Sequence, residues 1–118
     1  MKKGVDISIY KNSKNIKIKN VKKLSELGKV RGLMFRKKEK CPALLFEFEN
    51  SVKLKIHSFF VFFPFAAVWL DDKNNVIDMK IVRPFRISVS CREPFYKLLE
   101  IPINKYYKKE AEALFKKL

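Results

Sequence analysis

The sequence predicts an α+β domain: a bent, mostly antiparallel β-sheet or partial barrel with one internal helix and a C-terminal amphipathic helix. Three observations favour this class. Apolar and polar residues alternate over most of the chain, which is typical of half-buried strands. Two stretches instead repeat apolar residues at helical spacing. The spacers between most strands are too short for a helix to return over the sheet, which disfavours parallel crossovers.

The chain begins with a predicted β-hairpin. Residues 5–10 and 16–19 alternate apolar and polar side chains, and the polar segment 11–15 between them has the composition of a turn. A helix is expected next, over residues 21–31. Apolar residues recur there at helical spacing, Asn20 is suited to cap the first turn, and Gly32 can end the helix in a left-handed conformation.

The middle of the chain is rich in predicted strands. Alternation indicates strands over residues 44–48 and 52–56, and the stretch after His57, through Phe63, is apolar on both sides, which is typical of a strand buried on both faces. Pro64 should bend or interrupt that run. Further strands are expected over residues 66–70, 77–81, 85–89 and 96–101, with a turn at 71–75.

A C-terminal amphipathic helix is expected over about residues 104–118. Tyr107, Ala111, Leu114 and Phe115 form one apolar stripe, which should be buried against the sheet or a partner chain. No linker or repeat divides the sequence. With 118 residues, 47% of them hydrophobic, the whole chain 1–118 is expected to form a single domain with one core.

The composition favours a cytoplasmic protein with no membrane partner. No apolar stretch of signal-peptide length follows the basic start, and the longest apolar run, residues 59–70, is too short to span a bilayer. Cys41 and Cys91 do not form a close-spaced pair, so reduced thiols are expected. The oligomeric state stays open.

The charge is large and unevenly placed. The chain has 27 Lys and Arg against 12 Asp and Glu, a net charge of +15. Residues 1–40 contain 14 basic and 3 acidic side chains, a net charge of +11, so a polyanion would be attracted first to the N-terminal third. Lysine outnumbers arginine by 22 to 5, which fits non-specific attraction, or a merely solvated face, better than sequence readout.

The residues whose side chains could act in catalysis or bind a metal are scattered along the sequence. His57 is the only histidine, and it has no close-spaced metal-binding partner among Cys41, Cys91, Asp71 and Glu100. Nothing in the sequence places a nucleophile beside a base, and there is no glycine-rich phosphate loop. We therefore expect no catalytic residue, metal or cofactor. Glu100 is expected to be a partly buried carboxylate that pairs with a cation such as Arg36.

Five segments follow one another in an order and spacing that belong to a known family. They are Gly32-Leu33-Met34-Phe35-Arg36, Leu44-Leu45-Phe46-Glu47-Phe48, the run from His57 to Pro64, Val68-Trp69-Leu70-Asp71 and Leu98-Leu99-Glu100-Ile101-Pro102. Over about residues 5–102 the chain resembles domain-of-unknown-function family 192, whose biochemical role is not established. The resemblance therefore implies a family and no activity.

The chain departs from this family pattern in two places. Members commonly have a Phe-Trp-Met-Lys-Asn-Thr-like stretch where this chain has Phe59-Phe60-Val61-Phe62-Phe63, and an aspartate where it has Ala66. Both departures remove polar groups, which puts in doubt any activity that depended on them. The family also usually closes with a Gly-Asp-containing strand, whereas this chain ends in the expected helix.

Two functional hypotheses follow. The first is a non-enzymatic binding or interaction module whose basic face meets nucleic acid or an acidic protein without sequence specificity. The second is a small-ligand-binding protein or hydrolase with a cleft near Arg36, His57 and Glu100. The candidate polyanion-binding residues of the first hypothesis are Lys14, Lys17, Lys19, Lys22, Lys23, Lys37 and Lys38.

Overall fold

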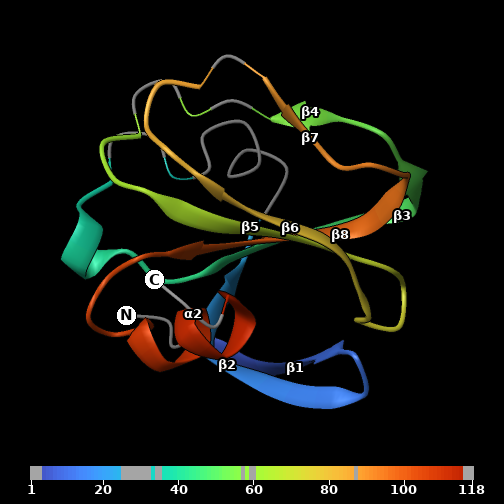
Figure 1. The fold of residues 1–118 in the computed structure, drawn as a ribbon, viewed down its shortest axis with the longest axis horizontal. Coiled ribbons are helices and arrows are strands. Elements are labelled where there is room, and N and C mark those ends of the chain that lie inside the picture. Colours follow the sequence, from blue (N-terminus) through green and yellow to red (C-terminus); the bar gives the residue numbers. More distant parts are fainter. Residues whose placement is uncertain are drawn as a thin grey trace.

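A six-stranded sheet that curls into a half-barrel forms the body of the protein (Figure 1). The computed structural model describes residues 4–24, 33, 36–56, 58, 61–86 and 88–115. The strands of the sheet lie in the order β1-β2-β3-β8-β5-β6. Their bounds are Val5–Lys11 for β1, Lys14–Lys23 for β2, Leu44–Val52 for β3, Phe95–Pro102 for β8, Phe65–Leu70 for β5 and Val76–Val82 for β6.

Short elements cover both faces of this sheet. A two-stranded ribbon of β4, Lys55–Ile56, and β7, Val89–Ser90, lies over one face, and the helix α2, Lys108–Phe115, lies against the other together with β1 and β2 (Figure 1). A 3-10 turn, η1, spans Lys38–Lys40. No helix in the described part of the chain is long and apolar enough to cross a membrane.

The expectation of a mostly antiparallel sheet is confirmed. Every pair of neighbouring strands in the six-stranded sheet is antiparallel except β2 and β3, which are parallel. In this pair Lys22 lies opposite Leu44. A parallel pair needs a long connection, and residues 24–43 supply it.

The first hairpin is tighter than its sequence suggests. Asn12 and Ser13 alone form the turn, with φ angles of 50° and 66°. Two consecutive left-handed residues are the pattern of a type I′ turn, whose twist matches that of the flanking strands. The turn is therefore shorter than the segment 11–15 that composition suggested, and β2 begins at Lys14.

The predicted internal helix is wrong at its beginning. Val21, which was expected to open it, belongs to β2, and Asn20 is not a helix cap. Asn20 instead has a φ angle of 54° at a bulge, where its side chain accepts a hydrogen bond from the Gly4 N–H at 2.9 Å. A Cβ at Gly4 would lie 2.6 Å from the Asn20 backbone, so this approach requires glycine. The rest of the expected helix, residues 25–31, lies outside the described residues.

Two predicted strands are also shorter in the structure. Residues 61–63 form no strand, and Phe62 is 59% exposed although Val61 and Phe63 are buried. Of the predicted strand over residues 85–89 only its last residue, Val89, lies in a strand, β7. In both segments the described residues before β7 belong to connections, where Val61 and Phe63 are buried while Phe62 and Phe85 are exposed. Residues 57, 59, 60 and 87 lie outside the described residues.

The central strands are buried on both faces, which explains their apolar sequences. Every residue of β5 is buried, and so are the last five residues of β8. On the face under β4 and β7 the core is built around Trp69, Phe95 and Phe46. On the opposite face, over which the sheet curls, the core includes Ile9 of β1, Ile18 of β2, Tyr107 just before α2 and Leu114 of α2.

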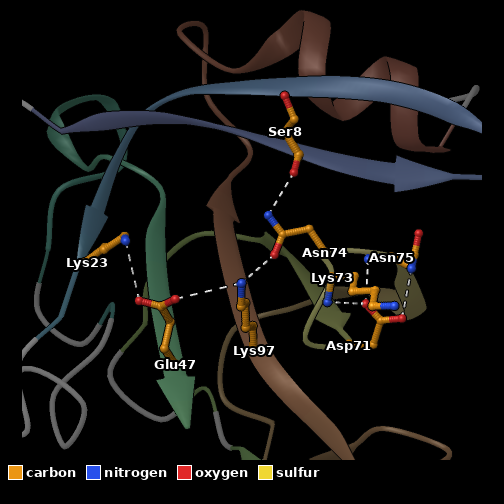
Figure 2. A network of polar contacts seen from close by, with 8 residues as sticks. All are labelled: Ser8, Lys23, Glu47, Asp71, Lys73, Asn74, Asn75 and Lys97. Carbon is orange, nitrogen blue, oxygen red and sulfur yellow. Dashed lines mark hydrogen bonds and ion pairs between the residues drawn. The ribbon is translucent and has the colours of Figure 1, made fainter. Parts of the chain in front are cut away.

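The turn between β5 and β6 holds the two ends of the curled sheet together. Asn74, at a φ angle of 68°, accepts a hydrogen bond from the Tyr10 N–H at 2.9 Å and donates one from its side chain to the Ser8 carbonyl at 3.0 Å. Asp71 shapes this turn by accepting hydrogen bonds from the backbone N–H groups of Lys73 and Asn75 (Figure 2). The sheet is thereby nearly closed between β1 and β6.

Helix α2 is fixed at both ends by polar contacts. Asn104 accepts a hydrogen bond from the Tyr107 N–H at 3.0 Å, and at the other end the Lys11 ammonium donates to the Leu114 carbonyl at 2.6 Å, where the helix dipole favours a cation. The helix begins at Lys108, four residues later than expected. The expected burial of its stripe is confirmed for Tyr107, Ala111 and Leu114.

We predict that Tyr107→Phe lowers the free energy of unfolding by about 1–3 kcal/mol. The Tyr107 hydroxyl accepts a hydrogen bond from the Ala43 N–H at 2.8 Å and donates one to the Asn20 carbonyl at 3.0 Å. Its removal leaves both of these backbone groups without that hydrogen-bond partner. Urea denaturation measures the change. Tyr106→Phe is the matched control, because Tyr106 is 47% exposed, and its stability should change by less than about 0.5 kcal/mol. Equal stability of both variants would contradict this role.

Candidate functional site

Three basic segments that lie far apart in the sequence meet where α2 begins. The Asn104 side chain donates a hydrogen bond to the Lys38 carbonyl of η1 at 2.8 Å. The Tyr107 hydroxyl donates to the Asn20 carbonyl, at the bulge of β2. The ammonium group of Lys19, the residue before this bulge, lies 4.4 Å from the centroid of the Tyr106 ring. The ends of β2, η1 and α2 are thus joined by direct contacts.

All of the lysines that the sequence predicted to form a basic face are exposed. Lys17 and Lys19 are two residues apart in β2 and therefore point to the same side of the strand. Lys37 and Lys38 lie at η1, beside the Asn104 contact. Lys22 follows the bulge, where its backbone N–H donates to the Ala43 carbonyl at 2.8 Å.

The sequence did not single out the lysines that α2 and η1 add at this place. Lys40, Lys105 and Lys108 are exposed and belong to the same two segments as Lys38 and Tyr106. The signal was present in the sequence, since Tyr106 is an aromatic residue between lysines, but the segment was interpreted as an amphipathic helix. We call the assembled set the junction surface, and it consists of Lys17, Lys19, Lys37, Lys38, Lys40, Lys105, Lys108 and Tyr106.

Few acidic groups touch the junction surface. Within the described part of the chain, Asp6 lies 3.9 Å from the Lys17 ammonium, and Glu39 accepts a hydrogen bond from the Lys105 N–H at 3.4 Å. The Lys17 and Asp6 side chains are 70% and 51% exposed, so water screens their interaction and it contributes little energy. The surface is therefore strongly positive overall.

Three of the predicted lysines, Lys14, Lys22 and Lys23, are not part of the junction surface. Lys14 pairs with Lys11, which contacts the far end of α2, so about 12 Å of helix separates it from the junction. Lys23 lies 3.6 Å from Glu47, which also contacts Lys97 at 3.8 Å (Figure 2). The Lys97 ammonium continues this network to the Asn74 side chain at 2.6 Å, so Lys23 takes part in the closure of the sheet.

The second predicted site, the cleft near Arg36, His57 and Glu100, is only partly visible. His57 lies outside the described residues. Arg36 is half-buried just before η1, and Glu100 is buried in β8, opposite Leu44 of β3. Glu100 is more deeply buried than the sequence suggested, and burial raises its pKa to about 8. Its expected pairing with Arg36 stays a prediction.

The buried thiol of Cys41 is influenced by the charges of both Arg36 and Glu100. Burial raises the pKa of the Cys41 thiol to about 11, while the Arg36 charge lowers it and the Glu100 carboxylate raises it further. Arg36, Cys41 and Glu100 are therefore within electrostatic reach of one another. A thiol with a raised pKa stays protonated at neutral pH, which makes Cys41 a poor nucleophile.

An exposed aromatic pair lies among the connections over the other face of the sheet. The rings of Phe62 and Phe85 meet edge to face with their centroids 5.7 Å apart, and both are more than half exposed. Phe85 has a φ angle of 64°, which is rare for a bulky residue. The buried Ser58 hydroxyl holds this turn by donating to the Arg83 carbonyl and accepting from the Arg86 N–H. No pattern in the sequence predicted this pair.

No group of three or more His, Cys, Asp or Glu in the described ranges is placed to hold a metal ion.

Comparison with known proteins places the chain in a family. The profile of DUF192, described as an uncharacterised ACR family, matches residues 8–112, which include all three segments of the junction. The chain belongs to this family. The resemblance over residues 5–102 is thereby confirmed, and the match extends further, into α2.

One curated relative resembles this DUF192 protein in sequence, and two solved structures share its fold. UPF0127 protein PH1112 of Pyrococcus horikoshii is 25% identical over 83 residues, which cover 69% of this chain and 72% of the relative. A solved protein of unknown function from Novosphingobium aromaticivorans has a TM-score of 0.68 and 14% identity, over 91% of this chain and 78% of that one. A structure from Sinorhizobium meliloti, described as a candidate transcription regulator, has the same score and identity, over 92% and 88%.

The structure shows the surroundings of Ala66, the position where the family commonly has an aspartate. Ala66 lies in β5 between Ile81 of β6 and Ile101 of β8, and it is fully buried in the core beneath α2. An aspartate at this position would place a carboxylate among apolar side chains. In this DUF192 member the position is a packing site.

We predict that Glu100 makes the stability of the protein depend on pH. Between about pH 4.5 and pH 8 the folded state keeps the Glu100 proton while the unfolded chain releases it. The free energy of unfolding should therefore fall as the pH rises through this window, by an amount on the order of a few kcal/mol, and should level off above pH 8. Glu100→Gln cannot titrate and should remove this decline, as measured by urea denaturation across the window.

Glu112→Gln serves as the control for this measurement, because Glu112 is an exposed carboxylate of α2. Its stability should follow the wild-type pH dependence. An equally steep decline in Glu100→Gln would show that Glu100 is not the titrating group.

Proposed function

We propose that this DUF192 protein is a non-enzymatic binding module that engages a polyanion with its junction surface. One observation carries the proposal: β2, η1 and the start of α2, each rich in lysine, are held together by the contacts of Asn104 and Tyr107. Gathered on one surface, their charges act on the same stretch of a polyanion.

The chemistry of the surface supports binding by charge more than by sequence. Lysine ammonium groups act as point charges toward phosphates, whereas specific base recognition favours the bidentate fork of arginine. All of the charged groups that define the junction surface are lysines. Binding should therefore be weakly selective among polyanions and should release counterions, which makes it sensitive to salt.

A second candidate function rests on the cluster of Arg36, Cys41 and Glu100. Arg36 and Glu100 both influence the pKa of Cys41, and a cation and a protonated carboxyl in one region would offer a small anionic ligand a charge and a hydrogen-bond donor. Saturable binding of a small ligand that is lost in Glu100→Gln, together with no binding of any polyanion, would favour this alternative over the junction surface.

We predict that the affinity for duplex DNA falls at least tenfold between about 50 and 200 mM salt, as expected if three or four phosphates are contacted. A triple variant, Lys19→Glu, Lys38→Glu and Lys105→Glu, reverses one charge in each joined segment. It should weaken binding strongly and flatten the dependence of the logarithm of affinity on the logarithm of salt. Fluorescence anisotropy with labelled duplexes of two unrelated sequences measures both effects, and the two sequences should bind equally.

The matched control reverses the same number of charges elsewhere. Lys53→Glu, Lys55→Glu and Lys73→Glu change exposed lysines outside the three joined segments, and therefore alter the net charge equally. This control should retain most of the affinity and of the salt slope. Equal losses in both triple variants would reduce the effect to net charge, and no binding by the wild type at the lower salt would refute the proposal.

A further inference from the structure

An aromatic ring lies within the lysines of the junction surface. Tyr106 is 47% exposed, although it directly precedes the fully buried Tyr107. A polyanion site that worked by charge alone would need no exposed ring. Its position between Lys105 and the first turn of α2 places the ring among the lysines of the junction surface.

The Tyr106 ring is held in place by its neighbours. Its centroid lies 4.8 Å from that of Tyr107, in an edge-to-face arrangement at 80°. Tyr107 in turn is fixed by hydrogen bonds to Ala43 and Asn20 through its hydroxyl and to Asn104 through its N–H. Tyr106 therefore presents its ring at low entropic cost, which favours stacking of a planar group.

The face of the Tyr106 ring already contacts one side chain, that of Lys19. The Lys19 ammonium lies 4.4 Å from the ring centroid, a cation–π contact at an exposed position, which is worth little energy. A planar base can exchange with that ammonium group at low cost. The displaced ammonium then stays beside the ring, where the phosphate of the stacked nucleotide would lie.

We propose that the polyanion bound by the junction surface is a single-stranded nucleic acid, with one base stacked on Tyr106. The proposal rests on the proposed function and adds the ligand class. Single strands expose the faces of their bases, whereas a duplex keeps them stacked within the helix. Aromatic rings set among basic side chains are the means by which proteins bind single strands without reading their sequence.

The test compares two single-stranded ligands that carry the same phosphates. One is a thymidine oligonucleotide of about ten nucleotides, and the other is an abasic strand of the same length. Tyr106→Ala should weaken binding of the thymidine strand at least fivefold and leave binding of the abasic strand unchanged. Tyr106→Phe keeps the ring and should retain the wild-type affinity for both. Tyr10→Ala, which removes an exposed tyrosine from β1, should also leave both affinities unchanged.

The outcomes separate this proposal from the one on which it rests. Equal wild-type affinity for the thymidine and abasic strands, with no effect of Tyr106→Ala, would overturn base stacking and leave the polyanion surface standing. A parallel loss for both strands in Tyr106→Ala, accompanied by a lower melting temperature, would reduce Tyr106 to a structural residue. No binding of any strand or duplex would overturn both proposals.

Discussion

The buried hydroxyl of Tyr107 is the contact on which the arrangement of the surface depends. It bridges the Ala43 N–H, before β3, and the Asn20 carbonyl, at the bulge of β2, while Asn104 connects the same turn to η1. The Ala43 N–H is buried and the two carbonyls are partly buried, so a partner inside the protein is favourable for each. Because a single side chain satisfies two of them, the start of α2 has one position relative to β2. The lysines of three segments come together as a consequence of that position.

The two-sided burial of the sheet explains where the charges lie. With β5 and most of β8 covered on both faces, the central strands have almost no room for polar groups, and Glu100 is retained there only as a largely neutral acid. The lysines are excluded to the hairpin, the connections and the helix surface. A basic sequence would produce such a distribution in any compact fold. What is specific to this chain is the network of hydrogen bonds that joins three basic segments at the start of α2.

The sequence predicted most strands, because alternation reports burial directly. The predictions were wrong where one pattern of apolar residues is compatible with two kinds of local structure. The apolar spacing that begins at Val21 fits a helix, but after a bulge at Asn20 the chain continues β2 through Val21 to Lys23. The run around Phe62 was interpreted as a buried strand, although residues 61–63 form a connection, because an apolar run does not specify hydrogen bonding. For the candidate surface, charge counting found the lysines of β2 and η1. It missed Lys105, Lys108 and Tyr106, because only long-range hydrogen bonds bring them there.

The central claim is that the fold assembles separate basic segments into one binding surface, and nuclear magnetic resonance tests it most directly. Backbone amide shifts would be followed while a short single-stranded oligonucleotide is added at low salt. The account predicts that the largest changes fall together on residues 17–20, 37–40 and 105–109. It would be contradicted by changes that spread evenly over the exposed lysines, or that concentrate on Lys53, Lys55 and Lys80 outside these segments.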